Sequence, residues 1–213
     1  MLGCMTDWAS WHLQYEDPGS ELSQRLVAVQ EQIALALQRA APGSPRLLSL
    51  CAGDGRDVLP VLAGHPRGRD VTGRLVELDP VLSGAARAAA PPSIEVLTAD
   101  AGSTAACAGA VPADLLLLCG IFGNVGDADV ARTVAAVPAL LATGGTVIWT
   151  RHRRAPDLTV RIRSWLSEAG VEEVAFATAP GSGWSVGAGV LRARSAPMPT
   201  PGGRLFTFQA REG

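Results

Sequence analysis

From residue 46 onward, short apolar runs alternate with segments of helical periodicity, and this alternation constrains the fold more than any other feature of the chain. Five runs have the length and composition of strands that are buried on both faces. These runs span residues 47–51, 71–77, 94–98, 114–119 and 146–150. The segments between them predict helices at residues 57–63, 80–90, 103–108 and 127–141. Because strands joined by helices run parallel, the pattern predicts a parallel sheet with helices on both faces.

The two ends of the chain depart from this alternation. Apolar residues spaced three and four apart from Leu22 to Leu37 predict a helix that Ser20 caps and that ends near Ala40. Near the other end, a helix at residues 157–169 precedes three strand candidates, residues 174–178, 185–191 and 205–209, with turn residues between them. We therefore predict an α/β fold whose doubly wound, mostly parallel sheet ends in a C-terminal antiparallel hairpin.

A chain of 213 residues is long enough to bury one core, so we predict one sheet domain with an N-terminal appendage. The sheet domain comprises residues 46–213. Residues 1–45 hold an aromatic segment, which includes Trp8, Trp11 and Tyr15, and the first long helix. We expect this N-terminal part to cover the ligand-binding side of the sheet.

All 18 basic residues are arginine, and the absence of lysine excludes several enzyme classes. Schiff-base and pyridoxal-phosphate enzymes, protein kinases and phosphate-loop NTPases place a lysine amine at the reacting centre. The formal net charge of −2 argues against a partner that is nucleic acid or an anionic membrane surface. No apolar run approaches the length of a membrane-spanning helix.

The four cysteines lie far apart and form no Cys-x-x-Cys pair. Cys4, Cys51, Cys107 and Cys119 therefore argue against a zinc site and against a disulfide framework, and we expect no bound metal. The first residues also lack the apolar run of a secretory signal. We expect a protein of the reducing cytoplasm that is a monomer or a homodimer.

Ligands of a doubly wound sheet bind at the carboxyl ends of the strands, so the loops there carry the functional argument. The first such loop contains Gly53 and Gly55, but Val58 stands where a dinucleotide fingerprint has its third glycine. Asp54 and Asp57 flank this loop, and each would disfavour a pyrophosphate by about 1 kcal/mol or more. A ligand with a cationic centre therefore fits this loop better than NAD does.

The next two loops each supply an acid. Glu77 ends the second strand, where a carboxylate can accept hydrogen bonds from both hydroxyls of a ribose. Asp79 begins the following helix, and Asp100 follows the third strand, where it could accept a bond from an adenine amino group. The alternative is that Glu77 and Asp100 are solvated or capping acids.

Together these loops resemble the motifs of class I S-adenosylmethionine-dependent methyltransferases. Residues 47–55 (LLSLCAGDG) resemble the glycine-rich first motif, residues 77–80 (ELDP) the second and residues 98–101 (TADA) the third. Residues 114–120 (DLLLLCG) resemble the fourth motif, and residues 140–146 (LLATGGT) the Gly-Gly turn before the fifth strand. The resemblance covers residues 46–192 and implies a Rossmann-like fold, S-adenosyl-L-methionine as the cofactor and methyl transfer as the activity.

The resemblance also implies how the cofactor is bound. The loop of residues 53–55 would contact its methionine part, Glu77 its ribose and Asp100 its adenine. Arg25, on the first long helix, could pair with its carboxylate, and Tyr15 could place an aromatic face beside its sulfonium. The full set of candidate cofactor-binding residues is Tyr15, Arg25, Cys51, Ala52, Gly53, Asp54, Gly55, Glu77, Leu78, Asp100, Ala101, Cys119 and Gly120.

Two positions in the first motif depart from the family pattern. Ser49 stands where an acid often binds the amino group of the cofactor, and Cys51 stands where the first glycine is usual. Gly53 and Gly55 are retained, so the backbone can still approach a ligand closely. Asp54 or Asp57 could take over the role of the missing acid.

Candidate catalytic residues lie on the acceptor side. His12 and His152 are the plausible imidazole bases, which methyl transfer needs only if the acceptor holds its proton. Asn124 could orient a polar acceptor or cap the helix that follows it. The alternatives are that His152 is structural and that Trp8 and Trp11 only attach the N-terminal segment to the sheet.

The local basic cluster comprises Arg151, Arg153 and Arg154 and is continued by Arg161 and Arg163. Arg151 or Arg153 could clamp a carboxylate or phosphate, so we expect a small-molecule acceptor and favour one with an anionic group. The alternative is a solvated surface.

Three other functions compete with this one. An enzyme that methylates DNA would carry an Asn/Asp-Pro-Pro-aromatic or Pro-Cys signature after the fourth strand, and residues 119–122 (CGIF) carry neither. An aminopropyltransferase-like enzyme shares the acid at the end of the second strand but needs an acid-lined polyamine pocket. A non-catalytic protein that binds S-adenosylmethionine or S-adenosylhomocysteine is the third alternative.

Overall fold

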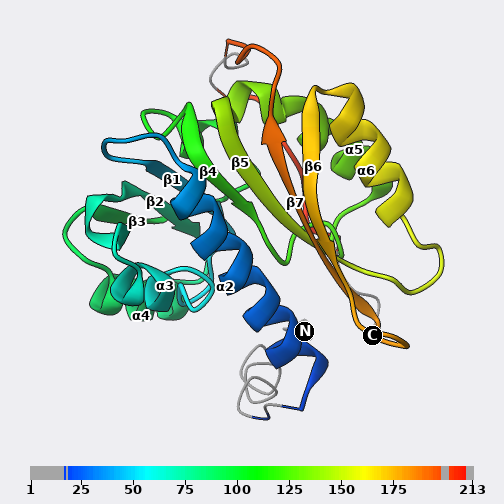
Figure 1. The fold of residues 1–213 in the computed structure, drawn as a ribbon, viewed down its shortest axis with the longest axis horizontal. Coiled ribbons are helices and arrows are strands. Elements are labelled where there is room, and N and C mark those ends of the chain that lie inside the picture. Colours follow the sequence, from blue (N-terminus) through cyan, green and yellow to red (C-terminus); the bar gives the residue numbers. More distant parts are fainter. Residues whose placement is uncertain (1–16, 18, 198–201, 210–213) are drawn as a thin grey trace, which may run out of the picture.

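The computed structural model describes residue 17, residues 19–197 and residues 202–209. In this part of the chain seven strands form one sheet in the order β3-β2-β1-β4-β5-β7-β6 (Figure 1). The strands are β1 (Arg46–Leu50), β2 (Thr72–Glu77), β3 (Ile94–Thr98), β4 (Ala113–Leu118), β5 (Leu141–His152), β6 (Val171–Ala177) and β7 (Trp184–Leu191). Neighbours among β1–β5 run parallel, whereas β7 is antiparallel to both β5 and β6. The predicted doubly wound sheet with a C-terminal antiparallel hairpin is confirmed.

Helices cover both faces of the sheet. They are α2 (Glu21–Arg39), α3 (Leu59–Gly64), α4 (Pro80–Ala89), α5 (Asp127–Leu140) and α6 (Thr159–Glu168), with the short 3₁₀ helices η2 (Gly68–Asp70) and η3 (Thr104–Cys107). Successive residues of a strand point to opposite faces. Leu47 and Leu48 of β1 are both fully buried, and each belongs to a different core cluster. Leu47 packs with residues of α2, α3 and α4, and Leu48 packs with residues of α5 and α6.

The first long helix begins as predicted. The Ser20 hydroxyl accepts a hydrogen bond from the Ser23 N–H at 3.1 Å, which satisfies one of the unpaired donors of the first turn. The buried face of α2 packs against β7 and β5. In Figure 1 this helix crosses in front of the sheet. No helix in the described ranges is both long and apolar enough to span a bilayer.

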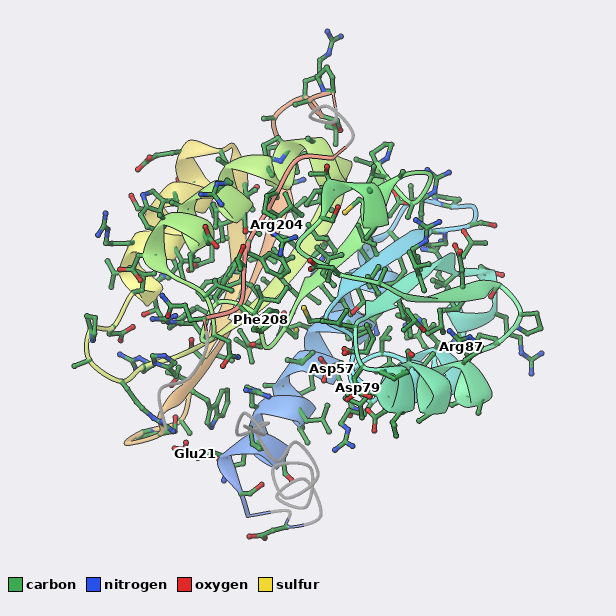
Figure 2. All side chains as sticks on the ribbon, turned by 180° about the vertical axis from the view of Figure 1, so that it is seen from behind. Glu21, Asp57, Asp79, Arg87, Arg204 and Phe208 are labelled. Atoms are coloured by element: carbon green, nitrogen blue, oxygen red, sulfur yellow. The ribbon has the colours of Figure 1, made fainter. Side chains whose placement is uncertain are left out.

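The predicted strand at residues 205–209 is wrong. Residues 202–209 instead form an extended segment on the face of the sheet opposite α2, where Figure 2 shows Arg204 and Phe208. The segment makes only isolated bridges, Ser103 with Arg204 and Val125 with Phe208. Leu205 and Phe206 are buried in the core beside η3 and α5. Ala106 and Cys107 of the four-residue helix η3 belong to the same core cluster as Leu205 and Phe206.

The Gly-Gly turn at residues 144–145 lies inside β5 rather than before it. Ala113 pairs with Leu141 and Leu115 pairs with Thr146, so two steps along β4 correspond to five along β5. This irregularity requires a residue at positive φ, which Gly144 provides at +86°. The strand therefore extends to Leu141, five residues before the predicted start.

Candidate cofactor and acceptor site

The loop after β1 turns sharply through three residues with positive φ. Gly53 and Gly55 adopt φ of +58° and +80°, and Cys51 adopts +57° although it carries a side chain. A left-handed conformation costs a non-glycine residue on the order of 1–2 kcal/mol. The Cys51 backbone therefore adopts, under strain, a conformation that glycine adopts freely.

Glu77 holds this loop in place from the end of β2. Its Oε2 accepts a hydrogen bond from the Gly53 N–H at 2.8 Å, and its Oε1 accepts one from the Asp79 N–H at 2.9 Å. Asp79 caps α4 through its own carboxylate, which accepts from the N–H groups of Val81 and Leu82. Asp79 thus has a structural role, whereas Glu77 faces the loop after β1.

The third acid, Asp100, has a partner that the sequence did not reveal. Its Oδ1 accepts a hydrogen bond from the Gly102 N–H at 2.8 Å, and its Oδ2 pairs with Arg204 Nη1 at 2.6 Å. Arg204 belongs to the C-terminal segment, which we predicted to be a strand. No local pattern in the sequence could have paired these two residues.

The Cys51 thiol lies close to both Glu77 and Asp100. Burial raises its pKa well above the ordinary range, and the negative charges of Glu77 and Asp100 raise it further. The thiol is therefore protonated at neutral pH. Its surroundings show that the loops after β1, β2 and β3 converge at one place, as the order of the motifs predicts.

A second group of side chains joins α2 to the same edge of the sheet. Burial raises the pKa of the Asp57 carboxyl, which the positive charge of Arg25 opposes. The Cys119 thiol, at the end of β4, forms a hydrogen bond with Asp57, and burial raises the pKa of this thiol as well. Arg25, Asp57 and Cys119 therefore come together from three separate elements.

Asp54 makes different contacts, although it is only three residues away. Arg56 donates to both of its carboxylate oxygens, from Nε at 2.8 and 3.1 Å and from Nη2 at 2.5 Å. The Arg56 N–H donates to the same carboxylate at 3.2 Å. Arg56, two residues further along the loop, thus binds the Asp54 carboxylate through its side chain and its backbone.

The remaining candidate cofactor residues that the structure describes lie on the same loops as these acids or after β4. Leu78 is exposed beside Glu77, while Ala52 and Ala101 are buried beneath the loops. The Gly120 N–H, after β4, donates to the Thr150 hydroxyl of β5 at 2.9 Å. Tyr15 lies outside the described residues, as do His12, Trp8 and Trp11.

Asn124 and His152, two of the candidate catalytic residues, lie at the carboxyl ends of the neighbouring strands β4 and β5. His152 ends β5, where it pairs with Trp184 of β7. Its ring lies so near Gly123 that a β-carbon there would be 3.2 Å from His152 Cδ2. The Asn124 side-chain amide donates to the Gly120 carbonyl at 2.7 Å. His152 therefore lies beside the loop after β4 that carries Asn124.

The arginine cluster divides into a buried and an exposed part. Arg151 is only 8% exposed, and its guanidinium donates to the Phe122 carbonyl, which ties β5 to the loop after β4. Burial lowers the pKa of Arg151. Arg153 is exposed and pairs with Asp157 at 3.1 Å. Arg151 therefore has a structural partner, whereas the Arg153 side chain lies at the surface in an ion pair.

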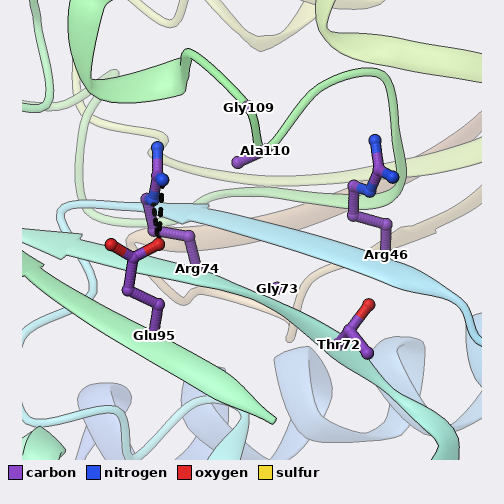
Figure 3. Close-up of a pocket in the computed structure, with 7 residues that line it drawn as sticks. All are labelled: Arg46, Thr72, Gly73, Arg74, Glu95, Gly109 and Ala110. Atoms are coloured by element: carbon purple, nitrogen blue, oxygen red, sulfur yellow. Dashed lines mark hydrogen bonds and ion pairs between the residues drawn. The ribbon is translucent and has the colours of Figure 1, made fainter.

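Other features of the described residues lie away from this site. They contain no cluster of three or more His, Cys, Asp or Glu side chains that could hold a metal ion. A pocket of about 200 Å³ lies among the first residues of β1 and β2, lined by Arg46, Thr72 and Arg74 among others (Figure 3). Arg74 there pairs with Glu95 and donates to the carbonyls of Ala106 and Ala108. This pocket is at the amino ends of the strands, opposite the loops described above.

Solved structures with a similar fold exist, although no sequence comparison gives a match. No protein-family model matches the chain, and no curated protein matches its sequence. Among solved structures, an O-methyltransferase family protein from Burkholderia thailandensis has a TM-score of 0.62 at 19% identity; the match covers 82% of this chain and 57% of that one.

Two further structures match over most of their length. Magnesium protoporphyrin IX methyltransferase from Synechocystis, with bound S-adenosylmethionine, has a TM-score of 0.64 at 12% identity and covers 87% of this chain and 91% of its own. A TehB-like methyltransferase from Corynebacterium glutamicum has a TM-score of 0.59 at 14% identity and covers 87% and 96%. This chain therefore has the Rossmann-like fold of the class I S-adenosylmethionine-dependent methyltransferases.

Proposed function

We propose that the chain binds S-adenosyl-L-methionine and transfers its methyl group to a small-molecule acceptor. The observation that carries the proposal is the position of the Glu77 carboxylate, held against the loop after β1 by the Gly53 and Asp79 N–H groups. An ionised carboxylate offers about four lone-pair positions, so two hydrogen bonds leave capacity for the two hydroxyls of a ribose.

The charges at the site suit this cofactor. Glu77 and Asp100 lie near the same thiol at the carboxyl ends of β2 and β3, and Asp57 lies on the loop after β1. A ligand that carries a sulfonium and an ammonium would offset these negative charges. A dinucleotide would instead bring two further negative charges to the same acids. The Synechocystis methyltransferase with the same fold holds S-adenosylmethionine, which supports this choice.

When bound, S-adenosylmethionine supplies an electrophilic methyl group on a positively charged sulfur. The protein's part is to hold the acceptor atom in line with that methyl group, and correct positioning alone can provide much of the acceleration. Asn124 would orient the acceptor, and the His152 imidazole would accept its proton where the acceptor is not already ionised. An anionic group on the acceptor would meet Arg153, at the cost of exchanging the exposed ion pair with Asp157.

Calorimetric titration with S-adenosylmethionine and S-adenosylhomocysteine tests the proposal. We expect both to bind, and we expect Glu77→Gln to weaken both by about 2 kcal/mol, because a neutral amide with one acceptor oxygen replaces a carboxylate that makes charge-assisted hydrogen bonds to the ribose. The control is Asp70→Asn, an exposed acid at the other end of β2. If the wild-type chain binds neither ligand, the proposed function is wrong. If it binds both but methylates no member of an acceptor panel, the non-catalytic alternative replaces it.

A further inference from the structure

The first motif lacks the acid that would bind the amino group of the cofactor, because Ser49 stands at that position and provides no carboxylate. Ser49 is buried on β1, at 4% exposure. Two acids follow it on the loop, Asp54 and Asp57. Their surroundings in the structure distinguish them.

Asp54 is already satisfied by Arg56. Three hydrogen bonds from the Arg56 guanidinium and one from its backbone N–H reach the Asp54 carboxylate. A ligand ammonium at Asp54 would have to compete with this bidentate pair, the strongest arrangement available to a carboxylate. Asp54 is therefore poorly suited to a new cation.

Asp57 makes its hydrogen bond outside its own loop, in contrast to Asp54. It precedes α3, yet the residue at the N-cap of that helix is Val58, and no side chain caps the helix. Asp57 is half-buried and forms a hydrogen bond with the Cys119 thiol. It also faces Arg25 of α2, a helix fastened to this loop because the Gln30 side chain donates to the Arg56 carbonyl at 2.9 Å.

The pair of Arg25 and Asp57 presents opposite charges at one end of the site. A zwitterionic α-amino acid group presents the same two charges in the complementary order. We propose that Asp57 binds the α-ammonium group of the cofactor and that Arg25 faces its α-carboxylate, so that this pair replaces the acid that the first motif lacks. This inference rests on the proposed function, because it concerns the same ligand.

Binding of an ammonium at Asp57 should also move a proton. The charged groups that face Asp57 are Arg25 from α2 and Asp54 and Arg56 from its own loop, with the Cys119 thiol after β4. Burial raises the pKa of the carboxyl in the free protein, and a neighbouring cation lowers it. Binding therefore releases a proton near the raised pKa, and affinity increases as pH rises through it.

The test compares S-adenosylhomocysteine with 5′-methylthioadenosine, which has the same nucleoside but no amino-acid part. We expect Asp57→Asn to weaken S-adenosylhomocysteine about ten- to a hundredfold and to leave methylthioadenosine within about twofold. Glu77→Gln should weaken both ligands. Calorimetry in buffers of different ionisation enthalpy should show proton release for the wild type and none for Asp57→Asn.

The outcomes separate this inference from the proposed function. If the wild type binds neither ligand, the proposed function fails. If it binds both but Asp57→Asn weakens both equally or neither, or if Asp54→Asn shows the selective loss instead, the assignment of Asp57 is overturned. Should Asp57→Asn fail to fold, Arg25→Gln decides the matter, because it must show the same selective loss of S-adenosylhomocysteine.

Discussion

Arg204 and Asp100 are 104 positions apart in the sequence, and their side chains form an ion pair with Nη1 2.6 Å from Oδ2. The pair anchors the C-terminal segment to the loop after β3. It also occupies one oxygen of the acid that we predict to accept a hydrogen bond from the adenine amino group. The C-terminal segment therefore contacts a predicted site residue, which the motif pattern does not indicate.

We predict that Arg204→Gln increases affinity for S-adenosylhomocysteine by up to about threefold, because Asp100 Oδ2 no longer has a competing donor. Both side chains are nearly half exposed, so the free energy of unfolding should fall by less than about 1 kcal/mol. Calorimetry and urea denaturation measure the two effects. The control is Arg192→Gln, which breaks an exposed pair with Glu172 on β6. A loss of affinity in Arg204→Gln would show that Arg204 itself holds the ligand.

We predict that Cys51→Gly stabilises the chain by about 1 kcal/mol, since glycine adopts φ of +57° without strain. The free energy of unfolding from urea titrations measures this change. Cys51→Ala is the matched control, because it removes the thiol but retains the β-carbon at the same φ, and it should give no gain. Equal stabilisation by alanine would mean that the thiol, not the backbone, is the source of the cost.

We predict that stability decreases above pH 9, in part through Cys107. Burial raises the pKa of this thiol from 9.0 to about 11. The folded state favours the neutral thiol, so the contribution of Cys107 to the free energy of unfolding is complete below pH 9. This contribution is lost as the pH rises toward 11, and the loss reaches about 2 kcal/mol. Denaturation of the wild type and of Cys107→Ala between these pH values measures it. The variant should lose less stability over this range; parallel curves would contradict the assignment.

We predict that Arg151→Ala lowers the free energy of unfolding by about 2–4 kcal/mol, because a buried guanidinium and its bond to the Phe122 carbonyl are lost. Arg153→Ala, whose side chain is exposed, should change it by less than about 1 kcal/mol. Thermal and urea denaturation of the two variants compare them directly. Two equally stable variants would show that Arg151 does not connect β5 to the loop after β4.

The strands, their order of occurrence and the loops at their carboxyl ends were predictable because they depend on local patterns. Leu47 and Leu48 illustrate this: an uninterrupted apolar run requires burial on both faces, and the structure gives each leucine its own core. The run at residues 205–209 has a similar local pattern but does not join the sheet. Its side chains Leu205 and Phe206 pack into the core beside η3 and α5. Whether such a run joins a sheet edge or packs on a face depends on segments that are distant in the sequence.

Local patterns in the amino-acid sequence were enough to predict the α/β class, the direction of the strands and the position of Glu77 at the end of β2, because periodicity and turn residues act over a few neighbouring positions. Three features became known only from the packing of the folded chain: Arg204 pairs with Asp100, Arg151 is buried, and Asp57 faces Arg25 and Cys119. These pairings join segments far apart in the chain. Which charges meet depends on how α2 and the C-terminal segment pack onto the sheet, and no local pattern encodes that.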